Sequence, residues 1–147
     1  MNAGTFLRST QLLEGDFFEN TIIFITEYNE KGAMGFVVNR LFPRSLNELQ
    51  AFNKCLPFPL YEGGPADQEH LFFIHRRPDL VADGVPVAGN IFIGGNFQQA
   101  VTHINNGTIT EKDVRIFIGY CGWDKGELEA EIKEGSWLAS ENEELFR

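Results

Sequence analysis

The residue types most able to do chemistry crowd into the stretch from Arg115 to Ile132, which holds Arg115, Tyr120, Cys121, Trp123, Asp124 and Glu127. Its pattern indicates a buried strand, a glycine-rich corner and an acidic helix. Cys121 lies at the corner, between Gly119 and Gly122. A nucleophile elbow places its nucleophile between a strand and a helix, and a helix N-terminus can lower the pKa of a thiol. Cys121 is therefore the candidate nucleophile of a hydrolase-like enzyme.

Two features of this corner weigh against a reactive thiol. The second glycine, Gly122, comes one position too early for the elbow motif. Asp124 and Glu127 place negative charge at the same helix start, and that charge opposes formation of a thiolate. We therefore interpret Cys121 as a small packing residue and keep the hydrolase as the alternative.

Polar residues elsewhere in the chain suggest a second kind of site. An arginine that points inward from a strand, as Arg115 would, needs a carboxylate partner because an unpaired buried charge is costly. We predict a polar cluster around this arginine, with the members Asn39, Arg40, Glu62, Arg115 and Glu129. The cluster is either an ion pair that supports the fold or a pocket for a small anion or a partner's carboxylate, and we favour the ion pair.

Aromatic residues flank the corner, with Tyr120 before Gly122 and Trp123 after it. Large rings beside a glycine either pack over its bare backbone or form a recognition surface. The helix that follows is strongly acidic, so one of its faces must be wet. The two rings would then frame an interaction surface at the start of that helix.

Glycine pairs and histidines are weaker candidates. Gly63-Gly64-Pro65 and Gly94-Gly95-Asn96 can present backbone amides to an anion, but tight turns and close backbone approach are the favoured interpretation. His70 and His75 would face opposite sides of one strand, so no metal site is predicted. We expect His75 to be a hydrogen-bonded strand residue and His103 to lie on the polar face of its helix.

Size and charge limit the class of protein. A chain of 147 residues suits one domain, residues 1–147. A net charge of -9 repels nucleic acid and anionic lipid, so neither direct nucleic-acid binding nor membrane binding is expected. The two cysteines form no disulfide framework, and neither a signal-peptide pattern nor a membrane-length apolar run is present, so we expect a cytosolic protein.

The elements that must position these residues follow from hydrophobic periodicity and turn signals. A turn at 29–32 joins the clearest antiparallel pair, and strands and helices neither alternate nor segregate, which favours an α+β domain with a mixed, mainly antiparallel sheet. Expected strands lie at 4–9, 21–26, 35–39, near Tyr61, and at 71–75, 85–87, 91–93 and 114–120, and capping residues Ser45, Asn96 and Asp124 open helices.

Several motifs occur together in a fixed order along nearly the whole chain. As a set, they resemble the AlgH/YqgE family of small bacterial proteins. The chain departs from the family pattern at Ala66, at Cys121, where a small residue such as Ala is common, and at Asp124-Lys125 and Glu127. The motifs are Phe18 with Thr21-Ile22-Ile23, the run from Gly32 to Arg40, Tyr61-Glu62-Gly63-Gly64-Pro65, His75, the run from Arg115 to Tyr120, Gly122-Trp123, Gly126, Leu128-Glu129, Glu131 and Trp137.

The resemblance implies an α+β fold whose bifurcated sheet is partly closed into a small barrel and surrounded by helices. It also implies no established catalytic activity and no cofactor. Members of the family are labelled transcriptional regulators, a label that comes from genetic association and not from a DNA-binding motif.

We therefore predict a non-enzymatic cytosolic binding or regulatory domain that acts indirectly, through an unknown protein partner or small ligand. The hydrolase remains the alternative, direct DNA binding is a disfavoured third class, and the oligomeric state is open. No catalytic or metal residue is assigned. The candidate binding residues are Asn39, Arg40, Tyr61, Gly63, Gly64, Pro65, Arg115, Tyr120, Gly122, Trp123 and Glu129.

Overall fold

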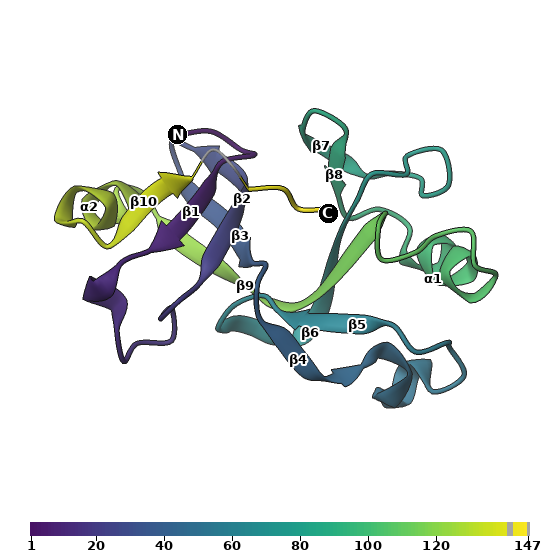
Figure 1. Ribbon diagram of the computed structural model, residues 1–147. Coiled ribbons are helices and arrows are strands. Elements are labelled where there is room, and N and C mark those ends of the chain that lie inside the picture. Colours follow the sequence, from purple (N-terminus) through teal and green to yellow (C-terminus); the bar gives the residue numbers. More distant parts are fainter. Residues whose placement is uncertain (141–142, 147) are drawn as a thin grey trace.

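The computed structural model describes residues 1–140 and 143–146 (Figure 1). These residues form a mixed, mainly antiparallel sheet with strand order β10-β1-β2-β3-β9-β6-β8-β7, and β5 lies between β4 and β9 off this path. The strands are β1 (Phe6–Ser9), β2 (Ile22–Asn29), β3 (Gly32–Val37), β4 (Leu41–Ser45), β5 (Pro59–Glu62), β6 (Ala66–His75), β7 (Val85–Ala88), β8 (Ile91–Ile93), β9 (Val114–Asp124) and β10 (Trp137–Ser140). The helices are α1 (Phe97–Asn105) and α2 (Glu127–Glu134), with short 3-10 turns η1 (Gln11–Leu13), η2 (Leu46–Glu48) and η3 (Gln50–Phe52).

Strand β9 joins two halves of the molecule. Its residues 116–118 pair in parallel with β5, residues 114–120 pair with β6, and residues 121–124 pair with β3. The sheet therefore forks along β9. Figure 1 shows β1, β2, β3, β10 and α2 on one side, called the first half below, and β4 to β8 with α1 on the other, the second half. This arrangement confirms the predicted α+β class with a mixed, mainly antiparallel sheet.

Each half buries apolar side chains on its outer face, and the two inner faces meet. In the first half, Leu7 and Trp137 pack with Leu128 of α2. In the second half, Ile116 and Ile118 pack with side chains of α1. A third cluster, which includes Phe24, Phe36 and Phe117, lies between the halves. The inner faces of the two halves are thus joined by this third cluster.

A bend at Gly119 changes which residues of β9 face inward. Phe117 and Tyr120 both belong to the cluster between the halves, although strict alternation would send them to opposite faces. Gly119 has φ 74°, a left-handed backbone that glycine adopts without strain. Residues after the bend are therefore shifted by one position, which turns Cys121 and Trp123 toward the cluster beside α2.

The glycine pair of the β5–β6 connection crosses β9 at this bend. The Gly63 amide donates to the Ile118 carbonyl at 2.8 Å. A Cβ on Gly64 would lie 2.2 Å from the carbonyl carbon of Tyr120, and one on Gly119 would lie 2.4 Å from the carbonyl oxygen of Gly64. Both backbones can approach this closely only because neither residue has a side chain. The interpretation of this pair as a close-approach device is confirmed.

Most predicted elements are present, with shifted ends. The hairpin of β2 and β3, the strand at 85–87 and the cap at Asn96, whose side chain accepts from the Gln99 amide, are all confirmed. Strand β6 begins at Ala66, earlier than predicted, because it continues past an irregular pairing between Ala66 and Leu71. Ser45 opens 3-10 turns and not an α-helix.

The predicted corner at 119–122 is wrong, so Cys121 does not lie at a turn before a helix. Strand β9 continues through it to Asp124, because residues 121–124 pair with β3. The turn comes later, at Gly126 (φ 84°), which caps α2 in place of Asp124. Half of the expected capping contact survives, since the Glu127 carboxylate accepts from the Asp124 amide at 2.5 Å.

Two further expectations concern the outer shape. The strand order is open, so partial closure into a barrel is not confirmed. The two α-helices lie at opposite ends of the described molecule and do not surround the sheet (Figure 1). Neither has the length and hydropathy that a membrane-spanning helix needs within the described residues.

Replacing Gly119 with alanine tests the crossing. We expect a loss of about 3 kcal/mol or more in unfolding free energy, because the new Cβ meets backbone atoms of Gly64 and Ala66 and strains the left-handed backbone. Gly107→Ala is the control, since Gly107 has φ 80° but nothing within 4 Å of its Cβ position, and it should cost about 1 kcal/mol. Urea unfolding measures both, and equal losses would contradict the role given to the crossing.

Candidate functional site

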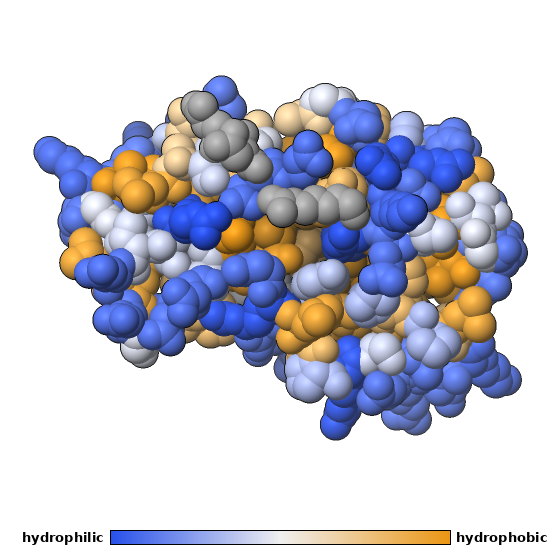
Figure 2. Space-filling model, in the orientation of Figure 1, coloured by the Kyte–Doolittle hydropathy of each residue, from blue (hydrophilic) through white to orange (hydrophobic). Residues whose placement is uncertain are grey.

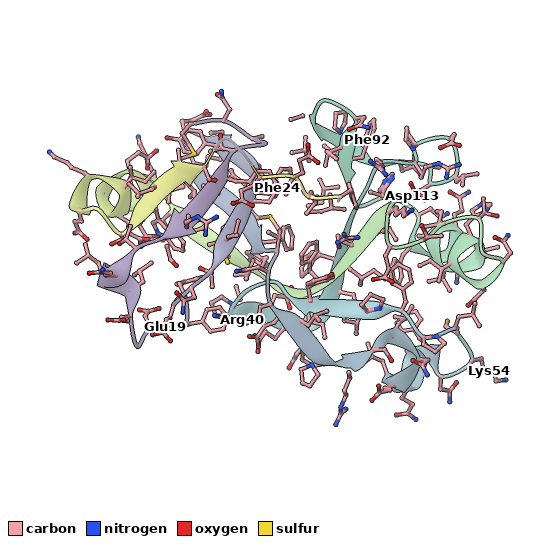
Figure 3. The ribbon with its side chains drawn as sticks, viewed as in Figure 1. Glu19, Phe24, Arg40, Lys54, Phe92 and Asp113 are labelled. Carbon is pink, nitrogen blue, oxygen red and sulfur yellow. The ribbon has the colours of Figure 1, made fainter. Side chains whose placement is uncertain are left out.

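The hollow between the two halves, called the central groove here, is the structure's strongest candidate site. It has a volume of about 440 Å³. Figure 2 shows apolar atoms between polar ones in this central part of the surface, and Figure 3 places Phe24 on one side of it and Asp113 on the other. Its lining includes Phe6 and Phe24 of the first half and Arg76 and Ile91 of the second.

Residues 143–146 lie along this groove. Glu143 forms an ion pair with Arg8 at 2.5 Å. Leu145 is 8% exposed and belongs to the cluster between the halves. The Phe146 ring lies 5.2 Å from the guanidinium carbon of Arg76 and also 5.2 Å from that of Arg115. Leu145 and Phe146 therefore line the groove, and the ion pair of Glu143 with Arg8 lies next to it.

Arg115 contacts Phe146, which lines this groove, but its partners differ from those predicted. Within the described residues it forms no ion pair with a carboxylate. Its guanidinium donates to the backbone carbonyls of Glu111 and Val114 and lies 5.8 Å from the Tyr61 ring. Stacking on rings leaves a guanidinium able to donate to further acceptors. The expected salt bridge of Arg115 is replaced by an arginine between aromatic rings.

Among the other members of the predicted polar cluster, only Arg40 and Glu62 pair with each other. Arg40 pairs with Glu62 at 3.5 Å and donates to the Glu19 carbonyl, away from the groove (Figure 3). The Asn39 side chain accepts from the Ile22 amide and donates to the Asn20 carbonyl, so it joins two backbone segments. The Glu129 carboxylate, on α2, accepts from the hydroxyl of Tyr28, which lies on β2. The favoured ion pair is therefore present only between Arg40 and Glu62, and the five residues do not meet in one cluster.

Tyr120 and Trp123 also separate, because they lie on opposite sides of β9. Tyr120 contacts Phe72 edge to face, with ring centroids 5.5 Å apart, and its ring lies beside exposed Gly122. Trp123 is 8% exposed and packs beneath α2. The two rings therefore do not frame one recognition surface, and only Tyr120 belongs to the groove side.

Glu131 is a residue whose part the sequence did not reveal. One carboxylate oxygen accepts from the indole N–H of Trp123 at 3.1 Å and from that of Trp137 at 2.9 Å. The sequence places Glu131 among solvent-facing acids, whereas it is half-buried. It holds α2 against β9 and β10. The signal available was the presence of two tryptophans, whose buried N–H groups need acceptors.

The glycine motifs use their amides within the fold. Val37 N–H donates to the Gly63 carbonyl, and Gly94 N–H donates to the Phe73 carbonyl. Gly63 and Gly64 are buried, while Pro65 is exposed at the turn. These contacts are architectural, as the favoured interpretation predicts.

The histidines also have structural surroundings. His75 is fully buried between the Gly94 carbonyl and the Arg77 amide, and burial lowers its pKa. His103 is half-buried, and its Nδ1 atom is buried without a hydrogen-bond partner in the described part of the chain, which differs from the predicted polar-face position. No group of three or more potential metal ligands occurs among the described residues.

Cys121 lacks the surroundings of a nucleophile. It lies within β9 opposite Gly35 and is 1% exposed. Burial raises the pKa of its thiol to about 12. Its Sγ donates to the Gly63 carbonyl at 3.3 Å. The thiol is therefore neutral and shielded, as expected of a packing residue.

Thiol labelling tests this environment. At pH 8 the folded protein should react quickly at half-buried Cys55 and negligibly at Cys121, because the thiolate is the reactive form. A Cys55→Ser variant should therefore stay unlabelled until denaturant is added. Because the pKa of Cys121 is raised, raising the pH to 10 should leave this result unchanged. Rapid labelling of folded Cys55→Ser would contradict it.

Replacement of Glu131 tests the double indole contact. Glu131→Ala should lower the unfolding free energy by about 2–4 kcal/mol, since both tryptophan N–H groups lose a charged acceptor. Exposed Glu134 on the same helix is the control, and its alanine variant should change stability by about 0.5 kcal/mol or less. Denaturant unfolding followed by tryptophan fluorescence measures both, and equal effects would contradict the assigned role.

A forked, mainly antiparallel α+β sheet with an arginine-flanked apolar groove is thus the class of structure to compare with known proteins. The AlgH-like family pattern matches residues 6–146. A UPF0301 protein of Chlorobium limicola is 37% identical over 92% of this chain and 72% of its own length. One from Chlorobaculum tepidum is 36% identical over 95% of this chain and 75% of its own length.

Solved structures agree with this result. The AlgH protein of Pseudomonas aeruginosa has a TM-score of 0.76 and 30% identity, covering 96% of this chain and 77% of its own. A protein of Corynebacterium diphtheriae has a TM-score of 0.73 at 21% identity, covering 95% of this chain and 75% of its own, and shares the fold. The chain belongs to the AlgH-like family, so the resemblance drawn from its motifs is confirmed.

Proposed function

We propose that this protein is a non-catalytic binding domain that acts in regulation through a partner protein held in the central groove. The regulatory part of the proposal extends the label of the AlgH/YqgE family to this chain, and the cytosolic location expected from the sequence belongs to the same proposal. The action is indirect: the chain carries a net charge of -9, which disfavours contact with DNA.

The position of Arg76 and Arg115 carries the proposal. Both guanidinium groups flank one aromatic ring beside an apolar lining. Arginine and aromatic residues dominate the binding energy of many protein interfaces, because they combine apolar area with directed hydrogen bonding. A cation over a ring contributes about 0.5–2 kcal/mol, depending on how far it is desolvated. The groove therefore supplies the groups that a protein ligand uses.

The alternative of a hydrolase gains no support from the site. It depended on Cys121 at a turn before a helix, and Cys121 is instead buried inside β9 with a raised pKa. The groove offers arginines and rings, which bind and orient a ligand. We therefore do not propose a reaction.

A peptide-display selection tests the binding function without assuming a ligand. Peptides enriched on the wild-type protein should lose at least about tenfold in affinity for Arg115→Ala, because the guanidinium facing the groove is removed. Arg44→Ala is the control, since Arg44 is exposed on β4 and should leave affinity unchanged. Circular dichroism checks that both variants fold. Recovery of only those peptides that bind wild type and Arg115→Ala equally would contradict a binding role for the groove.

A further inference from the structure

We propose that residues 143–146 are a built-in occupant of the central groove, which a partner protein replaces with a segment of the same chemistry. That segment carries an acidic residue followed, two and three positions later, by an aliphatic and an aromatic residue. This inference rests on the proposed binding function and names the class of ligand for the same site.

The three anchors of the segment define this chemistry. Glu143 meets Arg8, Leu145 enters the cluster of Phe6 and Phe24, and Phe146 lies between two arginines. Each anchor contacts a group outside the segment. A separate chain that presents the same side chains in the same order would meet the same groups.

The positive charge around residues 143–146 favours a negatively charged ligand. The whole chain is acidic, yet Arg8, Arg76 and Arg115 all contact residues 143–146. Arg76 also lies 3.5 Å from Asp113, which balances part of its charge. The cations concentrated here attract a carboxylate-bearing segment and disfavour a basic one.

The contacts that bind residues 143–146 to the groove are few enough for another segment to displace them. In the Arg8–Glu143 pair the Arg8 side chain is 56% exposed and the Glu143 side chain 13%, so water reaches the pair from the arginine side and weakens it. Leu145 is the only fully buried side chain of residues 143–146. Hollow space of about 440 Å³ remains beside the segment. A competing segment can therefore begin to bind before the built-in one has left.

The arrangement predicts competition between the two segments. A tethered segment acts at an effective concentration on the order of millimolar, so it weakens the apparent affinity of any added peptide for the same groove. Removing its anchors in the 147-residue chain should strengthen peptide binding. A peptide that copies residues 139–147, acetylated and fluorescently labelled, is the probe.

Fluorescence anisotropy measures the outcome. We expect the Leu145→Ala, Phe146→Ala double variant to bind the probe at least about tenfold more tightly than wild type. A probe with alanine in place of its leucine and phenylalanine should not bind. Leu138→Ala is the matched control, because Leu138 is 61% exposed on β10 and its removal should leave wild-type affinity unchanged. If the double variant does not fold, Phe146→Ala alone carries the same expected direction.

Three results would overturn the inference. They are affinities within about twofold for the wild type and the released variant, absence of probe binding to the folded released variant, and a wild-type dimer that the probe converts to monomer. The last result would make a second copy of this chain the natural occupant. Because the probe is one defined peptide, its failure leaves the function tested by peptide display standing, so the two failures are distinguishable.

Discussion

The close crossing of backbones at Gly119 and Gly64 is the constraint on which this structure depends. A single strand, β9, serves both halves, and it can do so only by bending where the β5–β6 connection passes over it. The left-handed Gly119 shifts side-chain alternation by one residue. Phe117 and Tyr120 therefore both join the cluster between the halves, while Cys121 turns into the cluster under α2. The position of the candidate site follows from this bend.

Side chains before and after the bend also make different kinds of contact. Side chains beyond it, such as Trp123, join α2 to the sheet through Glu131. Arg115, before the bend, lies beside the Tyr61 and Phe146 rings and donates to a backbone carbonyl oxygen. An arginine held by rings keeps donor capacity for a ligand. The structural role and the proposed binding role thus lie on different stretches of the same strand.

Sequence reasoning predicted the features that depend on local patterns. The β2–β3 hairpin, the Asn96 cap and the approximate positions of most strands were predictable because turn residues and periodicity act over a few residues. The end of β9 could not be predicted in this way. The glycines around Cys121 indicate a turn, and only the pairing of β3 with residues 121–124 shows that the strand continues. Pairing of distant strands overrides local preference.

The candidate site was predicted only in part for the same reason. Arg115, Tyr61 and Tyr120 were selected by residue type, and all three lie on the groove side. Asn39, Arg40 and Glu129 were selected equally, yet each is bound to a different part of the structure, because contacts between segments distant in sequence decided their positions. Residues 143–146 carried no motif, and their place in the groove becomes visible only once both halves are assembled.

Nuclear Overhauser spectroscopy on the 13C-labelled protein measures the central claim most directly. With the groove occupied as described, the Phe146 ring should show contacts to the Arg115 side chain, and Leu145 should show contacts to Phe24. Adding an unlabelled peptide that copies residues 139–147 should remove these contacts and replace them with intermolecular ones. Random-coil shifts for Phe146 without any such contact, or contacts that persist at saturating peptide, would contradict the account.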